Sequence, residues 1–109
     1  IGSLYTSVIP NLLSDEVVKI LKNSSAKKMY ISNIMTEHGE TDNYSVSDCV
    51  KQINRYAKGN FIDVVIANNG QVGEDILKLY NEENSQPIPL DKEELEKMNV
   101  KVIEDNFLK

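Results

Sequence analysis

The segment Gly2–Ser7 combines a glycine with three hydroxyl side chains just ahead of a predicted helix. Glycine lets a backbone approach a ligand closely, and the hydroxyls of Ser3, Thr6 and Ser7 can donate hydrogen bonds to it. The free amides of a first helical turn point the same way, so phosphate is the natural ligand for this pattern. The same residues also fit a capped helix start without a ligand, because one glycine does not make a phosphate-binding fingerprint.

A second polar segment, Asn33–Asp42, gathers hydroxyls and carboxylates around Gly39; they belong to Thr36, Glu40, Thr41 and Asp42. Such groups suit recognition of ribose or sugar hydroxyls, or a divalent cation beside a phosphate. A solvated loop whose Thr and Asp side chains form local turns has the same composition, so both interpretations stay open. His38 has the residue type of a general base, but a lone loop histidine does not identify catalysis, and no catalytic residue is assigned.

A third segment, Asn68–Gly73, follows an apolar run and is also compatible with a tight turn alone. Cys49 falls on the apolar face of a predicted helix, where a core position is expected. The chain has one Cys and one His, which cannot build a zinc site without carboxylates or a second chain. We therefore predict no metal site from the sequence.

Composition restricts the class of protein. The chain has 109 residues, 40% of them hydrophobic, and a formal net charge of −5, which fits one globular domain. No basic stripe with interleaved aromatics is present, so we expect no nucleic-acid partner. No apolar run approaches the roughly 18 residues of a membrane helix. A single cysteine excludes an internal disulfide and fits a reducing compartment, so we expect a cytoplasmic protein.

Apolar spacing and capping signals predict helices and strands in alternation. The predicted helices lie at Thr6–Leu13, after the caps Ser14, Ser45 and Asp91, and within Gly73–Glu83; the strands are Lys27–Met35, Phe61–Asn69 and Val100–Ile103, with a short extended piece at Gln86–Leu90. This order predicts a mainly parallel, doubly wound, Rossmann-like α/β sheet. Its ligands would bind beyond the carboxyl ends of the strands, where all three polar segments would lie.

Burial patterns accompany this prediction. An apolar stripe of Leu13, Val17, Ile20 and Leu21 is expected to be buried, as are Val46, Cys49, Val50, Ile53 and Ala57 on the helix after Ser45. The apolar run Met29–Ile31 is typical of a strand covered on both faces. Tyr80 is expected to pack in the core. A parallel sheet also calls for a strand before Gly2, which the sequence does not contain.

Two long segments, GSLYTSVIPNLL and YISNIMTEHGETDNYSVSDCV, resemble consecutive signatures of the CofD/YvcK-like family. That family includes bacterial gluconeogenesis factors and the 2-phospho-L-lactate transferases of deazaflavin-cofactor synthesis. The later FIDVVIAN, PIPLD and VKVIEDNFL resemble its closing strands. Because members are much longer, the resemblance implies that residues 1–109 are the C-terminal part of a single domain whose N-terminal strands are absent. Ile1 departs from the family's usual Gly-Pro-Gly-Ser pattern.

The resemblance lies closer to the gluconeogenesis factors, which implies a UDP-sugar-binding regulatory protein that supports cell shape and wall synthesis. The alternative is a phospholactate-type transferase that acts on a deazaflavin precursor and uses a nucleotide-activated donor with a divalent metal such as Mg²⁺. In either case the ligand is a nucleotide or nucleotide sugar, and a homo-oligomer is compatible with the sequence. The residues implied to line the ligand or phosphate cleft are Gly2, Ser3, Leu4, Thr6 and Ser7 on one wall and Asn33, Thr36, Glu40 and Thr41 on the other.

Overall fold

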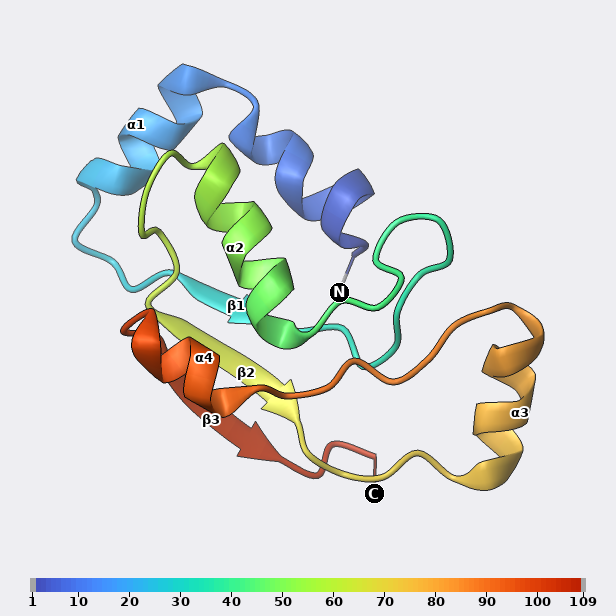
Figure 1. Cartoon of the computed structure of the whole chain (residues 1–109). Coiled ribbons are helices and arrows are strands. Elements are labelled where there is room, and N and C mark those ends of the chain that lie inside the picture. Colours follow the sequence, from blue (N-terminus) through green and yellow to red (C-terminus); the bar gives the residue numbers. More distant parts are fainter. Residues whose placement is uncertain (1, 109) are drawn as a thin grey trace.

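The computed structural model describes residues 2–108, so Ile1, where the family pattern is interrupted, lies outside the described residues. Figure 1 shows helices and strands alternating along the chain. In order, they are η1 (Leu4–Val8), η2 (Ile9–Leu12), α1 (Asp15–Asn23), β1 (Met29–Ile31), α2 (Val46–Tyr56), β2 (Val64–Asn68), α3 (Glu74–Glu82), α4 (Lys92–Lys97) and β3 (Lys101–Asp105). This is the predicted order, although β1 and β2 are shorter than the predicted strands and β3 begins and ends later than predicted.

The three strands form one open sheet in the order β1-β2-β3, and both pairings are parallel. Tyr30 of β1 pairs with Val65 of β2, which pairs with Val102 of β3. The next register row joins Ile31, Ile66 and Ile103. The predicted Rossmann-like α/β class with a parallel sheet is therefore confirmed.

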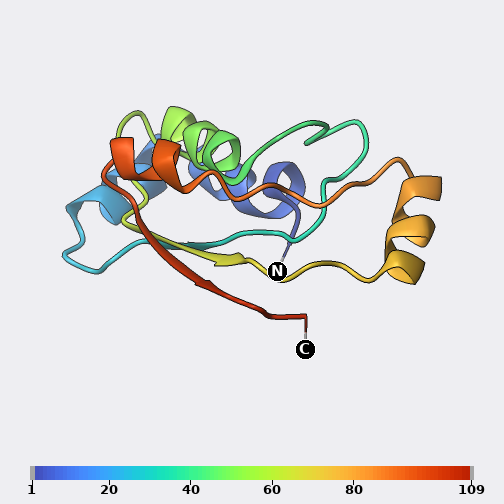
Figure 2. The same ribbon diagram turned by 60° about the horizontal axis from the view of Figure 1, so that its bottom comes forward.

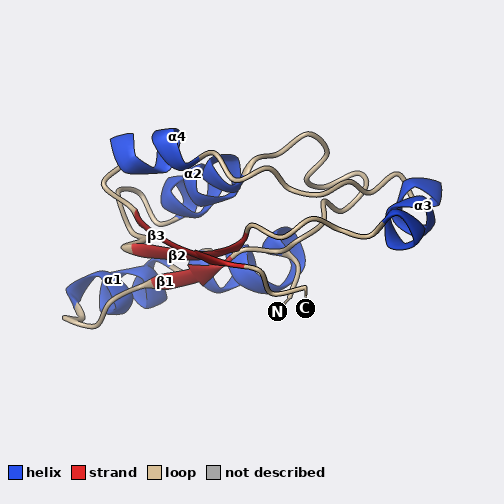
Figure 3. Ribbon diagram, turned by 90° about the horizontal axis from the view of Figure 1, so that it is seen from below, coloured by secondary structure: helices blue, strands red, loops and turns tan. Residues whose placement is uncertain are grey.

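Helices α2 and α4 lie over the same face of the sheet (Figures 2 and 3). Successive strand residues point to opposite faces, so Tyr30 and Val65 are buried beneath these helices. On the other face Met29, Ile31 and Ile103 are 52%, 47% and 41% exposed. The expectation that β1 is covered on both faces is thus wrong for the described residues, because only the face of Tyr30 is covered.

Helix α2 follows its sequence signals closely. Ser45 and Asp48 form a capping box, in which the Ser45 hydroxyl accepts from the Asp48 amide and the Asp48 carboxylate accepts from the Ser45 amide. All five residues expected on the buried face are at most 2% exposed: Val46, Cys49, Val50, Ile53 and Ala57. Local capping and periodic burial together determine this helix.

The N-terminal helices run beside α2 and beyond the β1 edge of the sheet (Figure 1). Ser14 caps α1 as predicted, with its hydroxyl accepting from the Val17 amide. The predicted apolar stripe is only partly confirmed: Leu21 packs against the core, but Leu13 and Ile20 are 64% and 70% exposed, and Val18, outside the stripe, is buried. At the sheet edge α1 packs on its neighbours through Val18 and Leu21, so Val17 and Ile20 are left exposed.

Helix α3 stands apart from the sheet at the end of two long connections (Figures 1 and 3). None of its residues is buried, and Tyr80, expected in the core, is 39% exposed. The returning connection contains the predicted extended piece, which pairs with the loop after β1 through an isolated antiparallel bridge between Met35 and Pro87. Among the described residues, no helix has the length and apolar character needed to cross a membrane.

Candidate functional site

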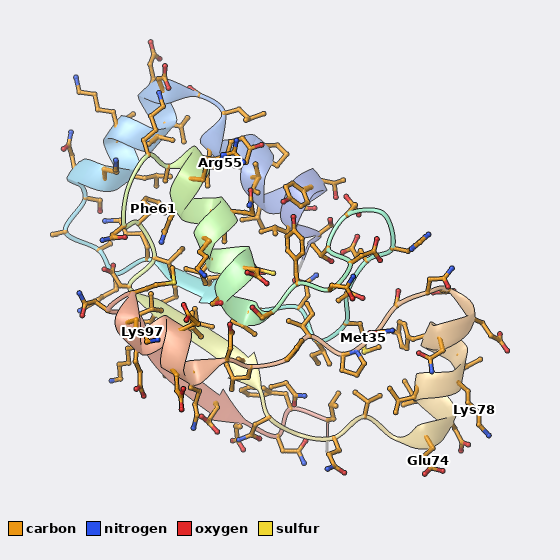
Figure 4. All side chains as sticks on the ribbon, viewed as in Figure 1. Met35, Arg55, Phe61, Glu74, Lys78 and Lys97 are labelled. Carbon is orange, nitrogen blue, oxygen red and sulfur yellow. The ribbon has the colours of Figure 1, made fainter. Side chains whose placement is uncertain are left out.

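The carboxyl ends of the three parallel strands meet at one edge of the sheet. The segments that leave this edge are Ser32–Tyr44, Asn69–Gly73 and Asn106–Leu108. The described start of the chain lies close to the same edge, because Gly2 contacts Asn33 of the loop after β1. Figure 4 labels Met35 where the loop after β1 meets the connection from α3, with Glu74 and Lys78 farther out on α3. This edge is where ligands bind in open α/β sheets.

The two walls implied by the sequence lie side by side. Asn33 Nδ2 donates to the carbonyl of Gly2 at 3.5 Å, the upper limit of a hydrogen bond. A hydrogen bond with the Glu37 carboxyl raises the pKa of Glu40, and the nearby Ser3 hydroxyl acts in the opposite direction. Gly2–Ser7 and the loop after β1 are therefore in direct contact, so no open cleft separates these particular side chains.

The residues of the N-terminal wall differ in their accessibility. Thr6 and Ser7 are exposed, whereas Leu4 is only 3% exposed and its side chain belongs to the core. Among the described residues, Leu4 could therefore contact a ligand only through its backbone. A Cβ atom at Gly2 would overlap the side chain of Ser7, which explains why glycine is required at that position.

Thr36 and Thr41 organise the loop after β1. Both are only 5% exposed. Thr36 Oγ1 accepts from the Gln86 amide at 2.9 Å, and Thr41 Oγ1 accepts from the Glu37 amide at 2.8 Å. Their hydroxyl oxygens hold backbone in place, so the contribution of these two residues to a ligand site is chiefly to shape it.

The N-terminus of α2 also lies at this edge, but its amides are already bonded within the protein. The Val46 amide donates to the Pro89 carbonyl at 3.0 Å, and the Ser47 amide donates to Asp91 Oδ1 at 2.9 Å. The Ser47 hydroxyl donates to Asp91 as well. Partial burial opposes ionisation of Asp91, but the hydrogen bonds from Ser47 outweigh it and lower the pKa. A carboxylate thus occupies the position that a bound anion would take at this helix.

Two cavities flank Asn33, Ser32, Ile34 and Asn68. The first has a volume of about 720 Å³, and the second about 350 Å³. The first extends over the exposed sheet face to α3, and its wall includes Ile31, Thr36, Glu37, Ile66, Tyr80, Glu83 and Phe107. The second lies on the α4 side; Asn69, Gly70, Lys92 and Glu104 contribute to it.

Of the residues expected in the site, the two cavities include Asn33 and Thr36, whereas the lining of neither includes any residue of Gly2–Ser7. Tyr80 and Phe107 were not expected there. Tyr80 had the spacing of a core residue, and Phe107 lies in the segment after the last strand. Asn68 and Gly70 belong to the third polar segment noted in the sequence, and Asn68 links it to Phe107 by accepting from the Phe107 amide at 3.0 Å.

His38 and the acidic residues do not form a metal centre. His38 Nδ1 lies 3.3 Å from Asp42 Oδ1 on the exposed part of the loop. Within residues 2–108 no three or more His, Cys, Asp or Glu side chains are grouped so that they could hold a metal ion. The Mg²⁺ considered with the transferase alternative would therefore need ligands from the nucleotide or from other parts of the protein.

The sequence model of one family, 2-phospho-L-lactate transferase CofD, matches residues 1–108. The chain belongs to the CofD family. Its curated relatives include a protein called a putative gluconeogenesis factor from Clostridium acetobutylicum, which is 48% identical over 99% of this chain, and the gluconeogenesis factor of Bacillus subtilis, which is 39% identical over 98%. This CofD-family chain spans 24% of the first relative and 34% of the second.

The fold of this CofD-family chain also matches solved structures. The crystal structure of a UPF0052-family protein from Bacillus halodurans superimposes with a TM-score of 0.94 and 36% sequence identity. That match covers 98% of this chain and 34% of the other. The family resemblance found in the sequence is therefore confirmed, and it extends over almost the whole chain.

Proposed function

We propose that this CofD-family chain is part of a gluconeogenesis-factor-type protein that binds a UDP-sugar at the carboxyl edge of its sheet. In this proposal the protein is a cytoplasmic regulator without a catalytic reaction of its own, and it supports cell shape and wall synthesis. The names of the similar proteins support the gluconeogenesis-factor assignment. The ligand class and the cellular role come from the family resemblance.

The observation that carries a binding function is the cavity of about 720 Å³ beside Asn33, Thr36 and Glu37. Its volume lies in the range of sites for small molecules, and its wall combines apolar side chains with a few polar ones. It opens at the strand ends, where ligands of open α/β sheets bind. The residues 33–37 that form part of its wall belong to the longer of the two family signatures.

The geometry around His38 does not support a role for this residue as a general base in either cavity. His38 would be the obvious general base of the loop, but it is paired with Asp42 and is not among the residues lining either cavity. A general base has to lie within hydrogen-bond reach of the proton that it removes. The described residues thus offer a pocket whose ionisable lining groups include Glu37 and Glu83 but not His38.

Isothermal titration calorimetry on the complete protein tests the proposal. We expect saturable 1:1 binding of UDP-N-acetylglucosamine and much weaker binding of GDP. A preference for GDP would favour the transferase alternative, in which a guanylyl-activated donor is used. Absence of heat with both ligands, in protein shown to be folded by circular dichroism, would reject both nucleotide-binding hypotheses.

A further inference from the structure

The side-chain carbonyl of Asn33 lacks a hydrogen-bond partner. Among the described residues, Asn33 Oδ1 is the one side-chain nitrogen or oxygen atom that is fully buried and makes no hydrogen bond. The other end of the same carboxamide makes only the long contact with Gly2. Buried polar atoms are nearly always bonded, so an isolated exception needs an explanation.

The surroundings of Asn33 make this exception specific to one atom. The neighbouring Asn68 uses both ends of its carboxamide, accepting from the Phe107 amide and donating to the Gly70 carbonyl at 3.0 Å. The Ser32 hydroxyl donates to the backbone carbonyl of Asn33 at 3.1 Å, and the Thr36 side-chain oxygen accepts from the Gln86 amide. The loop is therefore well bonded, and its one unsatisfied acceptor lies between the two cavities.

The chemistry of this atom selects one part of the proposed ligand. A carbonyl oxygen accepts hydrogen bonds and cannot bind a phosphate, which at neutral pH presents acceptors. Carboxylates, which also accept, line the same cavity at Glu37 and Glu83. A group rich in hydroxyl donors fits such a wall. The aromatic rings of Tyr80 and Phe107 line the cavity as well and can cover the apolar face of a sugar ring.

We propose that the larger cavity is the subsite for the sugar of the nucleotide sugar, and that Asn33 Oδ1 accepts a hydrogen bond from one of its hydroxyls. This inference rests on the proposed function and adds which end of the ligand lies at Asn33. Asn33 lines this cavity, and the one hydrogen bond that its carboxamide makes is the 3.5 Å contact with Gly2, which a rotation toward the ligand would break. The phosphates then lie away from Asn33, Glu37 and Glu83.

The proposal has two consequences that a purely structural role would not produce together. Replacing Asn33 with leucine, which has a similar size, removes an unsatisfied acceptor and therefore raises the melting temperature of the ligand-free protein, by about 4 °C or more. The same change removes the partner of the sugar hydroxyl. Affinity for UDP-N-acetylglucosamine should fall at least tenfold, whereas affinity for UDP should change less than twofold.

The experiment measures both ligands by calorimetry on the complete protein with Asn33→Leu, Asn33→Asp and the control Asn81→Leu. Asn33→Asp retains an acceptor and should keep more of the sugar-dependent affinity than Asn33→Leu. Asn81 lies exposed on α3 and outside the lining of both cavities, so its variant should bind both ligands normally. If the Leu variant does not fold, Asn33→Ala, which also removes the acceptor, takes its place.

Three outcomes separate the hypotheses. An equal loss of affinity for UDP and UDP-N-acetylglucosamine in Asn33→Leu, or no loss for either, overturns the sugar subsite while the proposed function stands. A wild-type protein that binds neither ligand overturns the proposed function and the subsite with it. A selective loss of the sugar-dependent part of the affinity, together with a raised melting temperature, supports the subsite.

Discussion

The hydroxyl oxygens of Tyr5 and Tyr44 lie 2.8 Å apart, and the two rings meet edge to face with their centroids 6.4 Å apart. Tyr5 belongs to η1, and Tyr44 ends the loop that follows β1. This pair joins the two segments in which the sequence placed the walls of the ligand site. It therefore fixes the position of the N-terminal segment relative to the loop.

Removing either hydroxyl should weaken that link. We expect Tyr5→Phe and Tyr44→Phe each to lower the free energy of unfolding by about 1 kcal/mol, because each leaves a half-buried hydroxyl without its partner. The double variant should cost less than the sum of the two, which urea denaturation in a double-mutant cycle measures. Tyr80→Phe on exposed α3 is the control. Additive effects would show that the two hydroxyls do not interact in solution.

Asp91 should stabilise the start of α2, although the two lie far apart in the sequence. Its carboxylate accepts from both the amide and the hydroxyl of Ser47, and hydrogen bonds to charged groups contribute about 1.5–3 kcal/mol. Asp91→Asn should lower the free energy of unfolding by about 2 kcal/mol at pH 7, measured in urea, whereas the exposed Glu93→Gln should change it little. A loss no larger than in Glu93→Gln would contradict this role.

The same interaction gives a dependence on acid pH. The pKa of Asp91 is lowered in the folded protein, so its stabilisation is complete above the unfolded pKa of about 4 and is lost as the pH falls through the folded value. The difference in stability between the wild type and Asp91→Asn should therefore shrink on acidification.

Much of the fold could be predicted from local signals, and α2 shows why. A capping serine, an acidic residue three positions later and apolar residues at helical spacing act within one stretch of chain, and all are visible in the sequence. Whether Ile20 or Val18 is the buried residue depends on what packs against α1, and local spacing does not specify this. The same applies to Met29 and Ile31, whose apolar character does not show whether both faces of β1 are covered.

The candidate site was predictable only in part for a similar reason. The strand ends located the loop of Asn33 and Thr36 correctly, because parallel strands bring their carboxyl ends to one edge. Tyr80 and Phe107 reach that edge through α3 and the segment after β3, and no pattern in the sequence shows this. The unsatisfied oxygen of Asn33 became visible only once its neighbours were placed in three dimensions.

Buried Cys49 should make the protein less stable at alkaline pH. Burial raises the pKa of its thiol to about 11, so the folded chain retains a proton that the unfolded chain releases near pH 9. Its contribution is therefore complete below pH 9 and falls by up to about 1.4 kcal/mol per pH unit until the folded thiol ionises. Burial also raises the pKa of Tyr30 and Tyr5, which extends the decline above pH 10.

Urea unfolding of the wild type and Cys49→Ala from pH 8 to 10 checks this prediction. The alanine variant should be less stable at pH 8 because of the cavity it leaves, but it should lose less stability as the pH rises. Parallel pH profiles of the two proteins would show that the thiol does not contribute.

The exposed sheet face should promote association when this chain is produced alone. Ile31 and Ile103 occupy one register row on the exposed face, and such apolar surface favours contact with other molecules. We expect sedimentation velocity to show concentration-dependent self-association. The double change Ile31→Lys and Ile103→Lys should reduce it at least tenfold.

Ile20→Lys is the matched control for these changes, because Ile20 is an exposed isoleucine on α1, away from the sheet face. It should leave association unchanged. A wild-type chain that sediments as a monomer at all concentrations would contradict the prediction.

The N-terminal hydroxyls provide a test of the wall predicted from the sequence. In the complete protein, the combined change Ser3→Ala and Thr6→Ala should weaken binding of UDP-N-acetylglucosamine at least several-fold if these hydroxyls donate to its phosphates. Ser25→Ala, in the exposed turn after α1, is the control. Unchanged affinity in calorimetry would assign Ser3 and Thr6 to local structure alone.

The position of α3 has a consequence for how proteins with this fold can diverge. The chain leaves the sheet after β2, forms α3 without burying any of its residues, and returns to α4 and β3. Insertions, deletions or substitutions in this segment between β2 and α4 need not alter the register of the strands or the main core. Because Tyr80 and Glu83 line the larger cavity, changes in the same segment can alter which ligands that cavity binds. Within the described residues, the lining of the larger cavity therefore depends on this segment, whereas the main core does not.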